Sequence, residues 1–298
     1  MSEPALVVRD LVVRYGARTA VAALSVTAAR GQVTAVVGPN GAGKTSTVEA
    51  CVGLRRRSSG DVTVLGSEVP VDGTLTPRVR ERIGVMLQDG GLYATARPLE
   101  LVRHVAGLYP GPADPAELLE RLGIDPQTRT TIRRMSGGEQ RRVACAVALV
   151  GNPELAFLDE PTAGLDAVGR REFHTLVRER VEAGCAVVLT THLMDDVERL
   201  ADHVVVVAGG RVVRAGTVAS TVSCPAATLA ASDAAAPRKS SSPAASSRTV
   251  SPNSPATVTD PAPTSRSSAG ASSSRLAGST RLRYAKSWSF QPQPWPRS

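Results

Sequence analysis

The feature that most constrains this chain is a pair of glycine-rich loops, each of which opens a stretch compatible with a helix. The first, GPNGAGKT, covers residues 38–45 and follows the apolar run 33–37. The second, SGGEQRR, covers residues 136–142 and begins 23 residues before the acidic pair Asp159 and Glu160. Backbone N–H groups at a helix N-terminus bind phosphate, so both loops predict anion sites. One nucleotide needs only one set of triphosphate contacts, whereas this chain carries two. We therefore expect two chains to share each nucleotide.

Alternating strand and helix patterns predict an α/β P-loop nucleotide-binding domain with a mostly parallel core sheet. The segments expected as strands are 6–15, 20–27, 33–37, 61–65, 83–86, 155–158, 186–190, 203–207 and 211–214. The segments expected as helices are 98–109, 115–122, 139–150 and 168–182. This order also predicts an antiparallel β subdomain at the start of the chain and a small helical subdomain at about residues 89–150.

The composition changes near residue 220. Residues 221–298 are rich in serine, alanine and proline and have no sustained helical or strand period. Such a segment buries too little apolar surface to offset the entropy of ordering, so we expect one domain over residues 1–220 and a low-complexity, disordered tail. Because the tail is basic and ends with Trp288, Phe290 and Trp295, it could lie near anionic lipid. Out-of-frame translation of a GC-rich gene end is the alternative origin.

The net charge of +8 does not predict a nucleic-acid partner. Residues 221–298 hold nine Lys or Arg and only two Asp or Glu, so residues 1–220 are nearly neutral. A nearly neutral domain lacks the broad basic face of a nucleic-acid binder. No stretch approaches the roughly 20 apolar residues of a membrane-spanning helix, and the first residues lack a signal-peptide pattern. We therefore expect a cytoplasmic protein without a nucleic-acid partner.

The motifs resemble those of the ATP-binding subunits of ABC transporters, from residue 1 to about residue 220. Residues 85–98 (VMLQDGGLYATARP) and 158–166 (LDEPTAGLD) are most similar to the ATPases of bacterial multidrug and antibiotic exporters. The resemblance implies ATP hydrolysis that drives export of a drug, antibiotic or other hydrophobic compound, with ATP and Mg²⁺ bound. It also implies a second ATP-binding subunit, expected to be an identical copy, and a separate transmembrane permease. The chain itself would then lie peripherally on the inner face of the cell membrane. Such exporters usually continue into a folded C-terminal domain, and this chain departs from that pattern.

The first loop carries most of the expected nucleotide contacts. Glycines at positions 38, 41 and 43 allow a tight backbone path around phosphate groups. Lys44, the only lysine before residue 239, would reach the β- and γ-phosphates, and the Thr45 hydroxyl would ligate Mg²⁺. The expected nucleotide-binding residues here are Gly38, Pro39, Asn40, Gly41, Ala42, Gly43, Lys44, Thr45 and Ser46.

The resemblance assigns roles to polar residues that follow predicted strands. Asp159 would assist Mg²⁺ binding, and Glu160 would be the general base that polarises the attacking water. Gln88 would sense Mg²⁺ and water, and residues 89–98 would contact the membrane partner. His192 occupies the place of the histidine that hydrogen-bonds the γ-phosphate. The alternatives are a helix-capping turn for the acidic pair, a solvated glutamine, and a packing or capping histidine.

Other residues match the family's contacts with the adenine base and its contacts across the dimer of ATP-binding subunits. Tyr15 would stack on adenine, although a strand-edge tyrosine also packs. The signature loop, which would bind the nucleotide from across the dimer, consists of Ser136, Gly137, Gly138 and Glu139. Residues 164–166 resemble the loop with cross-dimer contacts. The arginines at 55–57 and 141–142 are expected to be solvated or helix-end charges without a catalytic role.

Three other functions share part of this pattern. An ABC ATPase for import, or for lipid or polysaccharide export, has the same motifs and differs only in its partner. A soluble, non-transport ABC ATPase typically carries two cassettes or long coiled coils, whereas this chain shows one cassette and no sustained heptad repeat. A catalytically inactive binding module conflicts with the presence of both Lys44 and Glu160.

Overall fold

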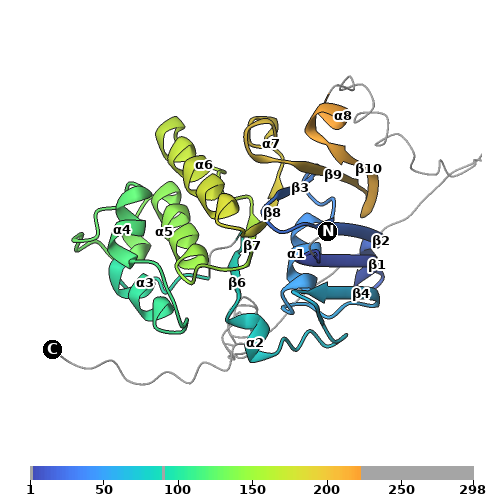
Figure 1. Cartoon of the computed structure of the whole chain (residues 1–298), viewed down its shortest axis with the longest axis horizontal. Helices are drawn as coiled ribbons and strands as arrows, with labels where there is room; N and C mark the ends of the chain where they lie inside the picture. The colour runs from blue at the N-terminus through green and yellow to red at the C-terminus, as the bar shows by residue number, and fades with distance from the viewer. Residues whose placement is uncertain (1–2, 89–90, 223–298) are drawn as a thin grey trace, which may run out of the picture. The chain divides into compact units, whose positions relative to one another are not determined.

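Two sheets organise the chain in this computed structural model, which describes residues 3–88 and 91–222 (Figure 1). One sheet has four strands in the order β2-β1-β4-β5, and the other has six in the order β10-β9-β3-β8-β7-β6. The strands are β1 (Leu6–Tyr15), β2 (Arg18–Ala28), β3 (Val33–Val37), β4 (Ser59–Val64), β5 (Ser67–Glu68), β6 (Ile83–Met86), β7 (Leu155–Asp159), β8 (Ala186–Thr191), β9 (His203–Ala208) and β10 (Arg211–Thr217). The helices are α1 (Lys44–Cys51), α2 (Pro77–Arg80), α3 (Pro98–Ala106), α4 (Pro115–Arg121), the 3-10 turn η1 (Ile132–Arg134), α5 (Gly137–Leu149), α6 (Ala167–Glu182), α7 (Met194–Leu200) and α8 (Val218–Val222).

The six-stranded sheet is parallel except at one edge. β6, β7, β8, β3 and β9 run in the same direction, and β10 pairs with β9 in the antiparallel sense. Every residue of β3, β7 and β8 is buried, as expected for strands covered on both faces. The four-stranded sheet is antiparallel. Together the two sheets confirm the predicted α/β class with its antiparallel β subdomain.

Helices α3, α4 and α5 gather on one side of the parallel sheet (Figure 1). Their buried side chains, among them Leu101, Leu119 and Leu149, belong to one apolar cluster with β7 and α6. α3 and α4 each begin at a proline, which is favourable because the first helical N–H has no intrahelical partner. α3 ends at Ala106, three residues earlier than the sequence predicted.

We expected Arg57 to be a solvated or helix-end charge, and the structure shows that it is buried. Its guanidinium donates hydrogen bonds to the carbonyl oxygens of Gly60 at 2.7 Å, Val69 at 2.6 Å and Pro70 at 2.9 Å. A buried cation needs such acceptors. Arg57 therefore fastens the loop after α1 to the four-stranded sheet, through backbone contacts that no sequence motif announces.

The expected tail, residues 221–298, lies outside the described residues apart from the last two residues of α8. The chain divides into the units Met1–Thr228 and Leu229–Ser298, and all the described residues belong to the first. The disorder, the lipid contact and the out-of-frame origin that we considered for the tail stay predictions. Among the residues that are described, no helix combines the length and the apolar character needed to cross a bilayer.

Glu154, at the start of β7, joins two cations from distant segments. Its carboxylate lies 2.8 Å from Arg30 Nη1 and 2.8 Å from Arg82 Nη2. Hydrogen bonding to Arg82, helped by Arg30 and opposed by partial burial, lowers the pKa of Glu154 from 4.5 to about 2. A carboxylate with a lowered pKa stabilises the folded state above its unfolded pKa, and this stability disappears as the pH falls through the folded value.

We therefore expect Glu154→Gln to lower the free energy of unfolding at pH 7 by about 1 kcal/mol, after allowance for solvent screening of a partly exposed pair. The melting temperature should fall by about 2–4 °C. Thermal unfolding measured from pH 7 to pH 2 should show the wild type and the variant converging below pH 4.5, with Glu182→Gln at an exposed site as the control. A difference at pH 2 as large as the one at pH 7 would exclude the charge as its cause.

Candidate functional site

Four loops with predicted site residues leave the same edge of the parallel sheet. β3 leads to Lys44, β8 to His192, β7 to Glu160 and β6 to Gln88. β8 pairs with β3 on one side and with β7 on the other. The loop with His192 therefore lies between the loop with Lys44 and the loop with Glu160. The carboxyl edge of such a sheet is where α/β folds bind ligands.

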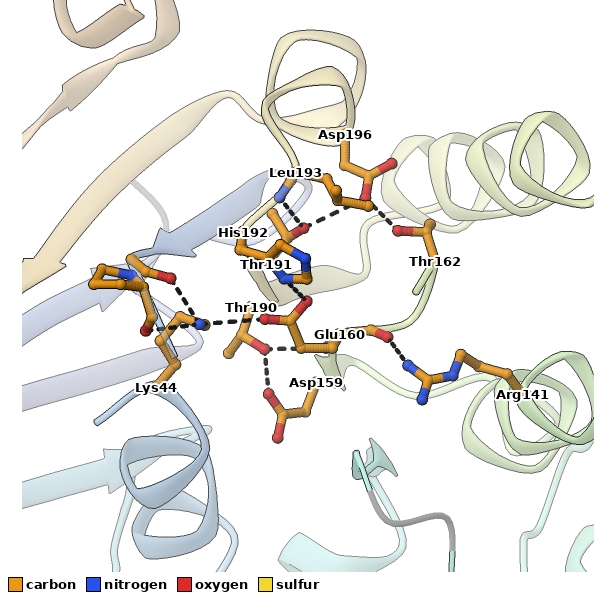
Figure 2. Close-up of polar contacts among 12 residues, drawn as sticks. Lys44, Arg141, Asp159, Glu160, Thr162, Thr190, Thr191, His192, Leu193 and Asp196 are labelled. Atoms are coloured by element: carbon orange, nitrogen blue, oxygen red, sulfur yellow. Dashed lines mark hydrogen bonds and ion pairs between the residues drawn. The ribbon is translucent and has the colours of Figure 1, made fainter. Parts of the chain in front are cut away.

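Three of the expected residues meet in one contact network (Figure 2). The Lys44 ammonium lies 3.2 Å from Glu160 Oε1, and His192 Nδ1 lies 2.7 Å from Glu160 Oε2. Lys44 also donates to the carbonyl oxygens of Gly38 at 2.8 Å and Pro39 at 3.3 Å. Lys44 and Glu160 are both about 95% buried. The glycine-rich loop, the acidic pair and the histidine therefore form one charged site, which is buried at Lys44 and Glu160 and exposed at His192.

Asp159 and Thr45, both expected at Mg²⁺, also come together. The Thr190 hydroxyl donates to Asp159 Oδ1, and the Thr45 side chain hydrogen-bonds the same carboxylate. Burial raises the pKa of Asp159, and the hydrogen bonds from Thr190 and Thr45 oppose that rise. Its other oxygen, Oδ2, is buried without a hydrogen-bond partner. An oxygen in that state fits a hard cation, which would supply the missing partner.

The backbone of the first loop passes too close to its neighbours for side chains at two glycines. A Cβ on Gly38 would lie 2.1 Å from the Val207 carbonyl oxygen. Gly43 has φ = 103°, and a Cβ there would lie 2.6 Å from the Ala20 carbonyl oxygen. Only glycine combines this conformation with this proximity. The loop therefore fits a phosphate cradle at the N-terminus of α1.

Glu160 has an unusual backbone, with φ = 51°. A non-glycine residue in the left-handed region costs about 1–3 kcal/mol and is found most often at functional sites. Its N–H donates to the Thr190 carbonyl oxygen at 3.0 Å, and its own carbonyl accepts from Arg141. Arg141, which we expected to be a solvated or helix-end charge, links α5 to the loop that carries Glu160. Thr190 and Arg141 are thus site residues that the motifs did not identify.

Tyr15 contacts the helix that follows the first loop. Its hydroxyl lies 2.9 Å from Ser46 Oγ, and the Arg55 guanidinium carbon lies 4.4 Å from the centre of its ring. Arg55 in turn pairs with Glu49 of α1. Tyr15 is 41% exposed as a residue, and the Arg55 guanidinium lies over one face of its ring. Arg55 therefore supports the ring, which corrects the expectation of a solvated charge.

Among the residues that the structure describes, no hydrogen bond or ion pair joins the signature loop, residues 136–139, to Lys44 or Glu160 of the same chain. Within residues 3–88 and 91–222, the polar side chains of Ser136 and Glu139 bond each other in a capping box at the start of α5. Ser136 is exposed. Gln88 is exposed as well, and lines a cavity of about 260 Å³ with Arg141 and Gly137. In the described part of the chain, no hydrogen bond joins Gln88 to Asp159 or Glu160.

The residues present fit a nucleoside triphosphate with Mg²⁺. The glycine-rich loop offers backbone donors at a helix start, and Lys44 supplies a cation beside them. Thr45 and Asp159 supply the hard oxygen atoms that Mg²⁺ prefers. An unpaired oxygen of Asp159, a buried cation and a glycine cradle converge at one sheet edge. This set can bind phosphate groups and place a carboxylate, Glu160, near them.

Comparisons with known proteins agree with this geometry. Residues 21–163 match the family model for ABC transporters. A daunorubicin resistance ATP-binding protein of Streptomyces coeruleorubidus is 40% identical over 73% of this chain and 69% of its own length. A fluoroquinolones export ATP-binding protein of Mycobacterium tuberculosis (strain CDC 1551 / Oshkosh) is 38% identical over 69% of this chain and 68% of its own length.

Solved structures show the same fold. An ATP binding subunit of an ABC transporter aligns with a TM-score of 0.67 and 25% identity, over 76% of this chain and 98% of that one. A dimeric bacterial ABC transporter cassette aligns with a TM-score of 0.63 and 22% identity, over 72% of this chain and 98% of that one. The sheet order, the buried Lys44–Glu160 site and these relatives agree, and the chain belongs to the ABC transporter family as one of its ATP-binding subunits, which are ATPases.

Proposed function

We propose that this ATPase drives export of a drug, antibiotic or other hydrophobic compound through a separate transmembrane permease. The contact of Glu160 with both Lys44 and His192 carries the catalytic part of the proposal. The relatives named for daunorubicin resistance and fluoroquinolone export support the substrate class. The chain would act at the inner face of the membrane, attached through residues 88–98. It would hold ATP jointly with a second copy of itself.

The residues suggest how the site would work on ATP. In the described structure the Lys44 ammonium is paired with Glu160, so a bound phosphate would replace Glu160 as its partner. Glu160, released from Lys44, would accept a proton from the attacking water, while His192 holds the other carboxylate oxygen. Thr45, Asp159 and Gln88 would hold Mg²⁺, which would offset the charge of the phosphates.

The exposed Ser136 loop supports a shared nucleotide. Ser136 and Gly137 are exposed, and they lie at the N-terminus of α5, where backbone N–H groups favour an anion. A second chain placed head to tail would bring this loop to the γ-phosphate, and ADP would lack that contact. ATP binding would close the pair and hydrolysis would open it, which gives the permease its two states.

Transport would be tested with the chain and its permease reconstituted in vesicles. We expect ATP-dependent movement of a hydrophobic drug from the face that carries this chain to the other face. A Glu160→Gln variant in the same vesicles should show none. Movement in the opposite direction, or a requirement for a solute-binding protein, would contradict the export proposal while leaving the ATPase assignment intact.

Loss of the Tyr15 ring should weaken ATP binding more than catalysis. Base–aromatic stacking contributes about 1–3 kcal/mol, so Tyr15→Ala should raise the KM for ATP about tenfold with a much smaller change in kcat. Tyr15→Phe keeps the ring and removes only the bond to Ser46, so it should remain close to the wild type. Steady-state ATPase kinetics measure both constants. An unchanged KM for Tyr15→Ala would remove Tyr15 from the nucleotide site.

A further inference from the structure

A second polar network lies beside the catalytic one, and none of the sequence motifs accounts for it. Its centre is Asp196 of α7, whose side chain is completely buried. Asp196 Oδ2 accepts hydrogen bonds from the hydroxyls of Thr162 and, at 3.4 Å, Thr191. Asp196 Oδ1 lies 2.8 Å from His174 Nε2. The loop after β7, helix α6 and the end of β8 therefore meet at one carboxylate.

The positions of the two threonines connect this network to catalysis. Thr162 follows Glu160 by two residues, and Thr191 immediately precedes His192. Both threonine side chains are buried. In Figure 2, Asp196 lies between the strand end that carries Thr191 and the loop that carries Thr162. One carboxylate oxygen thus holds the two loops that present Glu160 and His192 to each other.

Stability alone is a poor reason for this arrangement. Burial of a carboxylate costs free energy that partners must offset, and well-packed apolar residues of similar size are often as stable or more so. The network is also closely satisfied, because the Thr191 hydroxyl accepts from the Leu193 N–H at 3.0 Å while it donates to Asp196. A satisfied buried network restricts its members to one geometry.

We propose that Asp196 is a positioning residue for ATP hydrolysis: by holding Thr162 and Thr191 together, it keeps His192 in hydrogen-bond contact with Glu160. This inference rests on the proposed roles of Glu160 and His192. Asp196 itself touches neither of them and would not contact the nucleotide. Its loss would let the two loops separate, so that Glu160 samples orientations that are unproductive for proton transfer.

The neighbouring residue provides a matched control. Asp195 is also an aspartate in the first turn of α7, but its side chain is about half exposed and pairs with Arg199 and Arg170. Asp196→Ala and Asp195→Ala remove the same carboxylate one residue apart. We expect Asp196→Ala in the full-length chain to lower kcat for Mg-ATP at least tenfold with KM within twofold, and Asp195→Ala to leave both constants within twofold.

The threonines separate positioning from general damage to the fold. Thr162→Val removes one of the hydroxyls that Asp196 holds, so it should lower kcat by itself. Combined with Asp196→Ala it should add less than a further twofold, because both changes break the same connection. Independent losses that multiply in the double variant would overturn the proposal. If Asp196→Ala does not fold, Thr162→Val alone decides: a kcat within twofold of the wild type overturns the proposal.

Failure of the inference and failure of the proposed function give different results. If the wild type hydrolyses ATP, Glu160→Gln does not, and Asp196→Ala keeps a kcat within twofold of the wild type, only the role of Asp196 is wrong. If Glu160→Gln hydrolyses ATP at the wild-type rate, the catalytic assignment is wrong, and the role of Asp196 is wrong with it.

Discussion

ATP hydrolysis by the Glu160→Gln variant is expected to fall at least about 100-fold, because a general base contributes on the order of 10²- to 10⁴-fold and an amide cannot accept the proton. Glutamine keeps the size of the side chain and can still bond His192, so the site should retain its shape. ATP should still bind, since the change also removes the carboxylate that competes with phosphate for Lys44. The variant should therefore remain in the ATP-bound state.

Phosphate release and equilibrium nucleotide binding, measured on the same preparation, check this expectation. Glu182→Gln is the control for loss of one acidic charge, because Glu182 is exposed at the end of α6. Its rate should equal that of the wild type. A Glu160→Gln variant that hydrolyses ATP as fast as this control would show that the general base is another residue.

Lys44→Ala should abolish turnover for a different reason. The ammonium is the cation next to the glycine-rich loop, and alanine leaves the phosphate charge there without a partner. We expect no detectable hydrolysis and weakened ATP binding, measured by phosphate release and by a fluorescent nucleotide. Arg56→Ala removes an exposed cation close to α1 and should leave both properties unchanged. Normal turnover in Lys44→Ala would exclude the Lys44 loop as the nucleotide site.

Lys44→Ala should also lower the stability of the fold. A second variant can separate this loss of stability from the loss of turnover. Removal of one partner of a buried ion pair leaves an uncompensated charge and costs about 3–5 kcal/mol. For this pair, both side chains are nearly completely buried. The double variant Lys44→Ala/Glu160→Gln buries neither charge, so its melting temperature should recover toward the wild-type value while its activity stays absent. Calorimetry of the three variants measures the recovery.

Short-range patterns in the sequence were enough to predict the class of the fold. The β-branched run of β3 and the loop after it are local, and the structure confirms the strand at Val33–Val37. The order of the strands is not local. β8 inserts between β3 and β7. Its pairing with β3 joins segments that are more than 100 residues apart, and its pairing with β7, where Leu155 lies opposite Ala186, brings His192 to Glu160.

Adjacent identical residues show most clearly what the sequence could not predict. Of three consecutive arginines, Arg55 stacks on Tyr15, Arg56 is exposed and Arg57 is buried among carbonyl groups. Asp195 and Asp196 differ in the same way, one half-exposed and the other completely buried. Residue type and spacing are the same within each run. The environment depends on which distant segments pack there, and that information is absent from any short motif.

The central claim is that Lys44 of one chain and Ser136 of another bind the same ATP molecule. The mass of the Glu160→Gln variant in solution, measured by light scattering during size-exclusion chromatography with and without Mg-ATP, tests it most directly. The claim predicts the mass of one chain without nucleotide and of two chains with Mg-ATP, and it predicts that Ser136→Arg in the same background prevents the doubling. A single-chain mass at saturating Mg-ATP, or doubling that survives Ser136→Arg, would contradict it.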